Sequence, residues 1–226
     1  MPLTSFKQST ALLSGLFVGL LVLVLPPVQG TAYGEPPPPT PDLVDQAPRP
    51  FNGSFKEASL RGGPVLSSSD DVDRGWGSEA RLRTSFPMYL ADHSLVYDVA
   101  RLGDSDNRVQ VHGLQSTFAV HPFYLALLSE GLMSHFLASL HAEVGFGLRY
   151  GRASDGDIDA SLGIATSLSG GFDLPLSSPN RGRSLWLNAQ YRRTWTSLTL
   201  GPDDAQRLHD HRFFLGLAFR ANGVLW

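Results

Sequence analysis

Alternation of apolar and polar side chains is the clearest pattern in this sequence, and it is strongest between Ser134 and Gly151. The odd positions there are mostly small or polar, whereas the even positions are Phe136, Ala138, Leu140, Ala142, Val144, Phe146, Leu148 and Tyr150. Because successive side chains of a strand point to opposite faces, the run predicts one long strand with an apolar side. It exceeds the roughly nine to eleven residues that a tilted strand needs to cross a membrane.

Seven further runs complete the predicted set of strands. Alternation is clear over 160–169, 185–194 and 211–221, and weaker over 80–90, 94–101, 109–119 and 123–128. The second face of the clear strands is rich in glycine, serine and alanine, which suits the inside of a narrow barrel. The sequence therefore predicts an all-β fold, an antiparallel up-and-down transmembrane β-barrel of about eight strands.

The N-terminal third predicts no packed domain. Residues 1–30 have a short polar start, an apolar run over 11–25 and the pair Pro26-Pro27, which is the layout of a signal peptide. Residues 31–75 are rich in proline, serine and glycine and have no period, so we expect a disordered periplasmic segment. The predicted domains are thus 1–30 signal peptide, 31–75 disordered segment and 76–226 barrel.

Composition excludes several function classes. The formal net charge is -3 and no basic run occurs, so a nucleic-acid partner is not expected. The chain has no cysteine, which rules out disulfides and attachment as a lipoprotein. We find no phosphate-binding glycine loop and no metal-ligand spacing, and we therefore predict no cofactor and no metal.

Charged residues on the less apolar face of the predicted strands form the candidate site. If this face turns inward, buried charges must pair, and Glu143 with an arginine is the expected pair. A channel is the competing interpretation, but side chains fill the inside of an eight-stranded barrel, so we favour a polar plug. The expected interior cluster is His141, Glu143, Arg149, Gln190, Arg192, Arg212 and Arg220.

Three histidine pairings are candidates for catalytic or metal sites. His209 and His211 would point to one face of a strand, but no third ligand stands beside them. His93-Ser94 and Ser134-His135 are the adjacent serine and histidine pairs. Because adjacent strand residues face opposite sides, neither could supply a nucleophile and its base. We therefore predict no catalytic residue, and a protein that is not an enzyme.

The closing run Arg212–Phe219, the signal peptide and the alternating strands resemble the small outer-membrane β-barrel proteins of Gram-negative bacteria. In that family the last strand carries a glycine and terminal aromatic residues that the barrel assembly machinery recognises. Phe214, Gly216 and Phe219 approximate this pattern, although Ala221 occupies the final aromatic position. The resemblance implies an outer-membrane location, outer-membrane lipid and the assembly machinery as partners, and a structural, adhesive or envelope-maintenance role.

Aromatic residues are expected in a membrane-interface girdle, near strand ends or on outward faces. The residues assigned to this girdle are Tyr89, Tyr150, Trp186, Trp195, Phe213 and Phe219.

Two alternative functions stay open at this point. The first is a soluble periplasmic barrel that binds an apolar ligand inside, as lipocalin-like proteins do, with its apolar face turned inward. This reading and the membrane reading predict opposite exposure for Leu140, Val144 and Phe146. The second is an outer-membrane hydrolase that modifies lipids, which needs a serine and a histidine within hydrogen-bond reach.

Overall fold

The computed structural model describes residues 54–69, 72–86, 89–103, 108–129, 131–153, 161–179, 182–200 and 206–222. The predicted signal peptide and residues 31–53 of the predicted disordered segment lie outside this part of the chain. Among the described residues, no helix is long and apolar enough to cross a membrane.

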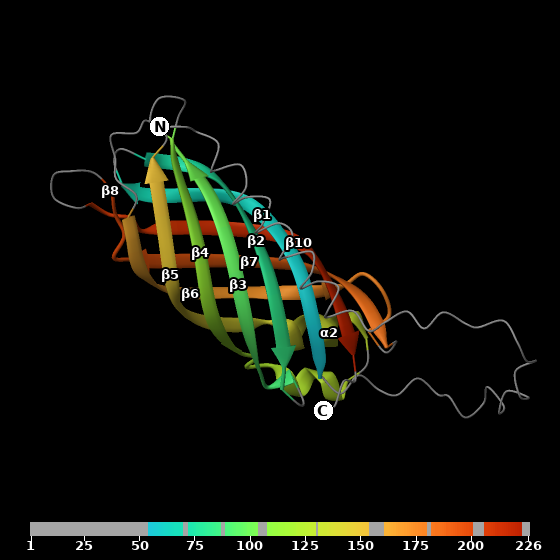
Figure 1. The fold of residues 1–226 in the computed structure, drawn as a ribbon. Helices are drawn as coiled ribbons and strands as arrows, with labels where there is room; N and C mark the ends of the chain where they lie inside the picture. The colour runs from blue at the N-terminus through green and yellow to red at the C-terminus, as the bar shows by residue number, and fades with distance from the viewer. Residues whose placement is uncertain are drawn as a thin grey trace, which may run out of the picture. The chain divides into compact units, whose positions relative to one another are not determined.

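Eight long antiparallel strands form a closed barrel (Figure 1). Each strand pairs with its neighbour in the sequence, and β10 pairs with β1 to close the ring. This confirms the predicted fold class. The strands are β1 (Phe55–Ser69), β2 (Val72–Ser85), β3 (Ala91–Leu102), β4 (Val109–Val120), β5 (His141–Ala153), β6 (Ser161–Pro175), β7 (Arg183–Thr196) and β10 (Asp210–Asn222), with the small ribbon β8 (Thr199–Leu200) and β9 (Gln206–Arg207) between the last two.

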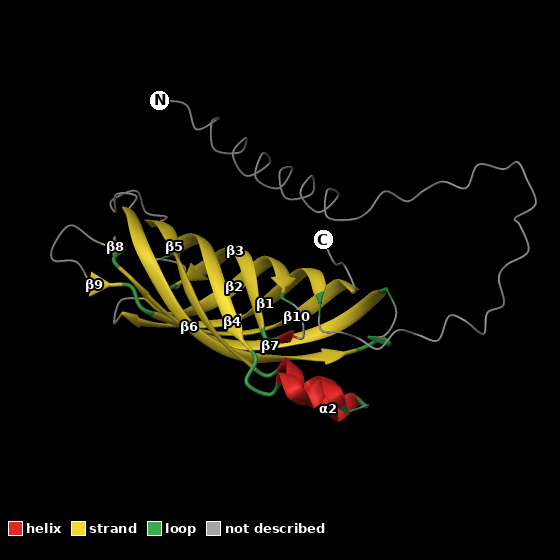
Figure 2. Ribbon diagram, turned by 90° about the horizontal axis from the view of Figure 1, so that it is seen from below, coloured by secondary structure: helices red, strands yellow, loops and turns green. Residues whose placement is uncertain are grey.

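The two ends of the barrel differ in their connections. Phe55 pairs with Asn222, so β1 begins where β10 finishes, and we call this the terminal end. The connection from β4 to β5 lies there and contains the 3-10 helix η3 (Tyr124–Leu128) and the helix α2 (Leu132–Ser139). Helix α2 packs against β6 (Figure 2). The opposite end, which we call the loop end, carries the connection from β7 to β10.

The prediction that residues 31–75 form a disordered segment is wrong for residues 55–69 and 72–75, which belong to β1 and β2. The barrel therefore begins at Phe55 and not at Trp76. The alternation in β1 is hidden because its inward side is polar and its outward side is interrupted by Gly62 and Pro64. The ladder between β1 and β10 breaks between Gly62 and Val65, which accommodates a proline that has no N–H to donate.

Two further predictions on strands are wrong. Residues 123–128 include η3 and are not a strand, and the run 134–151 is divided between α2 and β5. Helix α2 follows Gly131, whose φ of 115° suits a residue without a side chain. Its residues are apolar on most sides, so a few positions of it imitate strand alternation. The strand count of eight holds because β1 replaces the strand predicted at 123–128.

Candidate functional site

Many inward-facing side chains of the barrel are charged, and the described charges balance. Among the residues whose burial is described, seven arginines and seven carboxylates lie inside, each at most 5% exposed. All carboxylates whose burial the structure describes belong to this set. The arginines are Arg61, Arg81, Arg83, Arg149, Arg192, Arg212 and Arg220, and the carboxylates are Glu57, Glu79, Asp92, Asp98, Glu143, Asp173 and Asp210.

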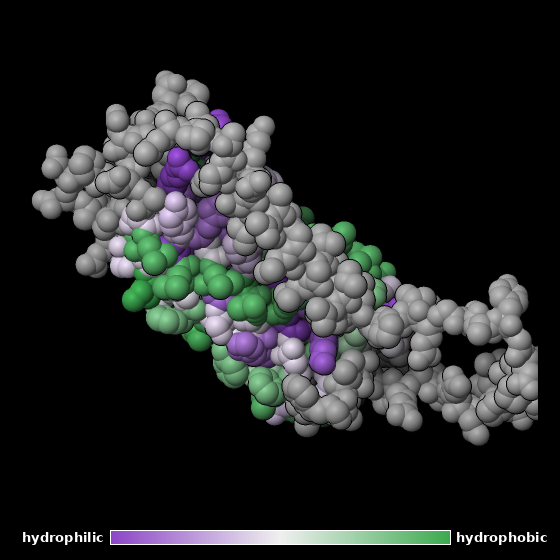
Figure 3. Space-filling model, viewed as in Figure 1, coloured by the Kyte–Doolittle hydropathy of each residue, from purple (hydrophilic) through white to green (hydrophobic). Residues whose placement is uncertain are grey.

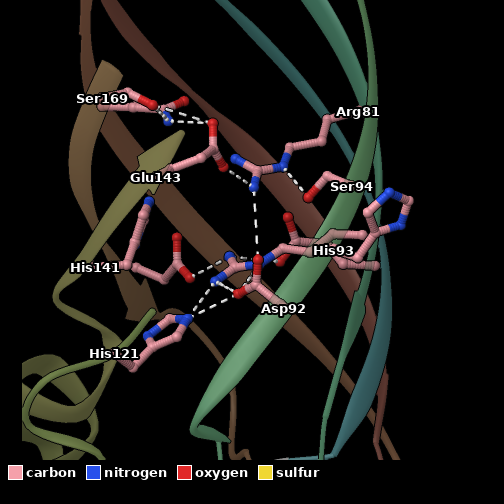
Figure 4. A network of polar contacts seen from close by, with 12 residues as sticks. Arg81, Asp92, His93, Ser94, His121, His141, Glu143 and Ser169 are labelled. Atoms are coloured by element: carbon pink, nitrogen blue, oxygen red, sulfur yellow. Dashed lines mark hydrogen bonds and ion pairs between the residues drawn. The ribbon is translucent and has the colours of Figure 1, made fainter. Parts of the chain in front are cut away.

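The ion pairs form three layers between the two ends of the barrel. Glu143 belongs to the middle layer (Figure 4). It forms a close ion pair with Arg81, and its Oε1 lies 3.3 Å from Nη2 of Arg192. Arg192 also donates from Nη1 to Oε2 of Glu79 at 2.6 Å, and Glu79 pairs in turn with Arg61. The layer thus joins strands β1, β2, β5 and β7 through buried ion pairs. Loss of one partner would leave the other charge buried without compensation.

The layer nearer the loop end is built from two arginines and two aspartates. Arg149 Nη1 lies 2.5 Å from Asp210 Oδ2, and Arg212 Nη1 lies 2.5 Å from Asp98 Oδ2. Arg212 also donates from Nε to Asp210 Oδ1 at 3.0 Å. These four residues come from β3, β5 and β10, so the layer connects opposite sides of the barrel wall.

The layer nearer the terminal end contains Arg83, Asp92, Asp173 and Arg220, and it includes His121, which directly follows β4. Arg83 donates from Nη1 to Asp173 Oδ2 at 2.8 Å, and Arg220 pairs closely with the same carboxylate. His121 Nε2 lies 2.7 Å from Asp92 Oδ2, and its Nδ1 lies 3.1 Å from the Ala138 carbonyl oxygen. Burial lowers the pKa of His121, although the hydrogen bond with Asp92 opposes this shift.

Apolar clusters close the interior at both ends. At the terminal end, Phe55, Tyr89 and Ala138 of α2 pack together, with η3 residues against them. At the loop end, the residues come from β1, β3, β4 and the connection from β7 to β10. They are Val65, Ala100, Leu102, Val109, Val111, Leu198 and Leu208. Apolar side chains thus flank the charged network at both ends of the described interior.

All seven residues of the predicted interior cluster lie buried inside the barrel. The structure brings Glu143, Gln190 and Arg192 together, with Gln190 Nε2 donating to Glu143 Oε1 at 3.0 Å. Arg149 meets Arg212 at Asp210, and Arg220 lies in the terminal layer. His141 Nδ1 lies 2.9 Å from the Ser139 carbonyl oxygen.

Most residues that pair with this cluster were not predicted from the sequence. Arg81 and Arg83 share one face of a strand that the sequence marks only weakly, and Glu57 and Arg61 lie in the segment expected to be disordered. Their alternation with outward Leu60 and Leu82 is the signal that could have placed them inside. No local pattern marks His121, because its partners come from distant elements.

The outward face is apolar. Val144 is 57% exposed and Phe146 is 61% exposed, and hydrophobic side chains cross the middle of the face seen in Figure 3. Leu140 lies between α2 and β5 and does not test the exposure pattern. An apolar exterior around a charged interior contradicts the soluble lipocalin-like alternative, which needs the reverse arrangement. It is the architecture of a transmembrane barrel of the outer-membrane type, whose strands face lipid.

The girdle predicted from aromatic residues is only partly observed. Tyr89 and Trp186 are buried inside, which contradicts their assignment to the membrane interface. Both contact Arg220 in the interior instead. The Arg220 guanidinium carbon lies 3.9 Å from the centre of the Trp186 ring, and Arg220 donates to the Tyr89 hydroxyl at 3.1 Å. Tyr150, Phe213 and Phe219 are exposed on the outward face.

A serine and a histidine that are distant in the sequence meet on the lipid-facing side. His93 Nε2 lies 2.8 Å from Ser116 Oγ, and both side chains are exposed. Ser94 points inward and accepts a hydrogen bond from Arg81, so His93 and Ser94 do face opposite sides (Figure 4). At the loop end, His211 Nδ1 lies 2.6 Å from the Tyr191 hydroxyl. The described residues contain no group of three or more side chains that could hold a metal.

No protein-family profile matches the sequence, and no curated protein matches it either. The chain is similar to several solved structures. Neisserial surface protein A is 12% identical with a TM-score of 0.42, over 74% of this chain and 96% of that one. The attachment invasion locus protein Ail of Yersinia pestis is 13% identical with a TM-score of 0.45, over 73% and 98%. The outer membrane protein OprG of Pseudomonas aeruginosa is 12% identical with a TM-score of 0.35, over 74% and 96%.

Proposed function

We propose that the protein is a non-conducting outer-membrane barrel with a structural, envelope-maintenance role. The observation that carries this proposal is the balanced set of seven arginines and seven carboxylates between two apolar seals. A conducting pore needs a continuous hydrated path, whereas this interior is occupied by side chains that bind one another. Separating these pairs would leave buried charges without compensation, so thermal opening of several pairs together is rare.

Electrical recording tests the proposal directly. The full mature chain is refolded, its folding is verified by heat-modifiable migration on a gel, and it is inserted into a planar bilayer beside a porin as positive control. We expect no discrete current steps from this protein under conditions in which the porin conducts. Regular, reproducible current steps from the folded protein would contradict the proposal and favour a channel.

Hydrolysis of lipid esters is the second candidate, and it is favoured by the pair Ser116 and His93 on the lipid-facing side. The histidine could accept the serine proton and so activate the hydroxyl as a nucleophile. The described residues contain no exposed carboxylate that could orient the imidazole, and we therefore rank this function below the structural role. Release of fatty acid from a fluorogenic phospholipid, abolished in S116A but kept in S94A, would reverse this ranking.

Assembly and orientation follow from the same proposal. Because the predicted signal peptide precedes β1, we expect the terminal end to lie in the periplasm and the loop end to face outward. We further expect outer-membrane lipid around the barrel and insertion by the barrel assembly machinery, which would recognise β10. Phe219 is exposed on the outward face of this strand, whereas Phe214 is buried inside.

A further inference from the structure

The connection from β4 to β5 at the terminal end is almost entirely apolar. Its described residues, 121–129 and 131–140, include no aspartate, glutamate, lysine or arginine, and by sequence Glu130 is the one such residue between them. Six of its large apolar side chains are 39–79% exposed. We call these six the terminal apolar surface, and they are Phe123, Leu125, Leu128, Leu132, Met133 and Leu137.

Helix α2 directs polar side chains toward the barrel and large aliphatic side chains away from it. Ser139 is buried, and its Oγ lies 2.7 Å from the Asp173 carbonyl oxygen and accepts from the Asp173 N–H at 2.9 Å. The His135 ring meets the buried Trp186 ring edge-on, with 6.4 Å between their centres. Met133, in contrast, is 67% exposed. A surface helix of a water-soluble protein has the opposite arrangement, with its apolar side packed on the protein and its polar side in water.

The terminal apolar surface is continuous with the lipid-facing wall of the barrel. Phe172 of β6 lies on the outward face, because it directly precedes the inward Asp173. The ring of Phe136 in α2 packs against it, with 5.1 Å between the ring centres. Helix α2 therefore contacts the outer side of the wall as well as its rim. Along β4, the exposed outward residues Phe118 and Val120 lead to the exposed Phe123, which begins the helical connection.

We propose that the terminal apolar surface is embedded in lipid, with η3 and α2 inserted at the boundary between headgroups and acyl chains of the leaflet at the terminal end. A helix in this position buries its apolar side by about 5–10 Å. Helix α2 has eight residues and is about 12 Å long, which suits a helix that lies at the boundary and does not cross the membrane.

Lipid matches this surface better than a protein partner does. A protein interface has a polar rim around its apolar core, whereas the apolar residues here continue into the lipid-facing wall. The helical connection would add lipid contacts beyond the strands and so resist movement of the barrel along the membrane normal. The inference rests on the membrane placement of the barrel and is independent of whether the barrel conducts, which electrical recording tests separately.

Single cysteines test the proposal, because the chain has none of its own. L128C and M133C carry a fluorescent label on η3 and α2. F146C carries it on the lipid-facing wall, and S178C carries it on the exposed connection between β6 and β7 at the same end of the barrel. Each full mature chain is refolded into phosphatidylcholine vesicles. The label is quenched either by phosphatidylcholine with a nitroxide on its acyl chain or by iodide present on both sides of the membrane.

At L128C and M133C we expect strong quenching by the nitroxide lipid, close to that at F146C, and protection from iodide. S178C is expected to show the reverse. Heat-modifiable migration checks that each variant is folded, and L125C and L132C replace a position at which the variant does not fold.

Three results would overturn the proposal. Iodide quenching at L128C and M133C as strong as at S178C would mean that the surface faces water. Protection from both quenchers would mean that protein covers it, for which residues 31–53 of this chain or a second copy are the candidates. Absence of nitroxide quenching at F146C would contradict the membrane placement on which the inference rests, and the control thus separates this failure from the other two.

Discussion

Arg220 and Glu57 lie directly opposite each other on β10 and β1, with Nε of the arginine 2.6 Å from Oε2 of the glutamate. Both side chains are buried, and the pair spans the seam at which the last strand closes on the first. Arg220 also pairs with Asp173 of β6 and stacks on Trp186 of β7. One guanidinium group therefore connects the seam to β7 and β6.

Replacing Glu57 by alanine should destabilise the barrel by about 3 kcal/mol, because it leaves the buried Arg220 with one carboxylate fewer. The free energy of unfolding is measured by urea titration in lipid vesicles. The neighbouring outward variant K56Q is the control and should leave stability nearly unchanged. An unfolding curve of E57A that superimposes on wild type would show that the seam does not depend on this pair.

Gly216 illustrates how closely the backbones approach inside the barrel. A Cβ atom at this position would lie 2.1 Å from the Leu60 carbonyl oxygen and 2.6 Å from Arg61 Cα. Forcing atoms into a packed interior typically costs about 1–3 kcal/mol, and here the obstacle is backbone. We expect G216A to refold poorly, as measured by the heat-modifiable fraction on a gel.

Gly62 provides the matched control for that variant, because it lies outward on the neighbouring strand. A Cβ there would meet nothing closer than 3.5 Å, so G62A should refold like wild type. Equal yields of the folded form in G216A and G62A would contradict the close approach of β1 and β10.

Stability should fall as the pH is lowered through the range in which His121 would normally titrate. Burial lowers the pKa of His121 in the folded barrel, so the folded state resists the proton that the unfolded chain accepts at its usual pKa of about 6.5. The unfolded state thus binds more protons, and the free energy of unfolding decreases with falling pH below that value. The imidazole is surrounded by Arg83, Asp92, Tyr89 and His141. Of these, Arg83 and Asp92 keep their charges in this pH range.

The measurement is the free energy of unfolding between about pH 8 and pH 5, the interval in which histidine changes its charge. H121Q is expected to be less stable than wild type at the upper limit, because the hydrogen bonds are altered, and to lose less stability on acidification. A wild-type profile that rises with falling pH would reverse the sign assigned to this group.

The strands that could be predicted are those whose outward residues are large and apolar. In β5, β6, β7 and β10, residues such as Phe146 and Leu215 alternate with small or charged ones, and period and face follow directly. Strand β1 was not predicted, because Pro64 and Gly62 occupy its outward face. A large apolar residue at these positions would have marked the period. Sequence periodicity therefore failed where the wall itself is irregular.

The interior network could be predicted only in part, because its pairing depends on the register between distant strands. Arg149 and Asp210 are 61 residues apart, and nothing local indicates that their side chains meet. The terminal seal was also missed, because it is formed by a short helix whose residues partly follow strand alternation. The inward position of Arg192 and Arg212, in contrast, follows from parity alone.

Cell fractionation combined with a gel comparison of boiled and unboiled samples tests the central claim, that this chain forms a closed transmembrane barrel in the outer membrane. The account predicts recovery with the outer membrane and a folded form that migrates differently from the boiled form. Recovery as a soluble periplasmic protein would contradict it, because the exposed side chains of Leu60, Phe146 and Leu162 would then face water.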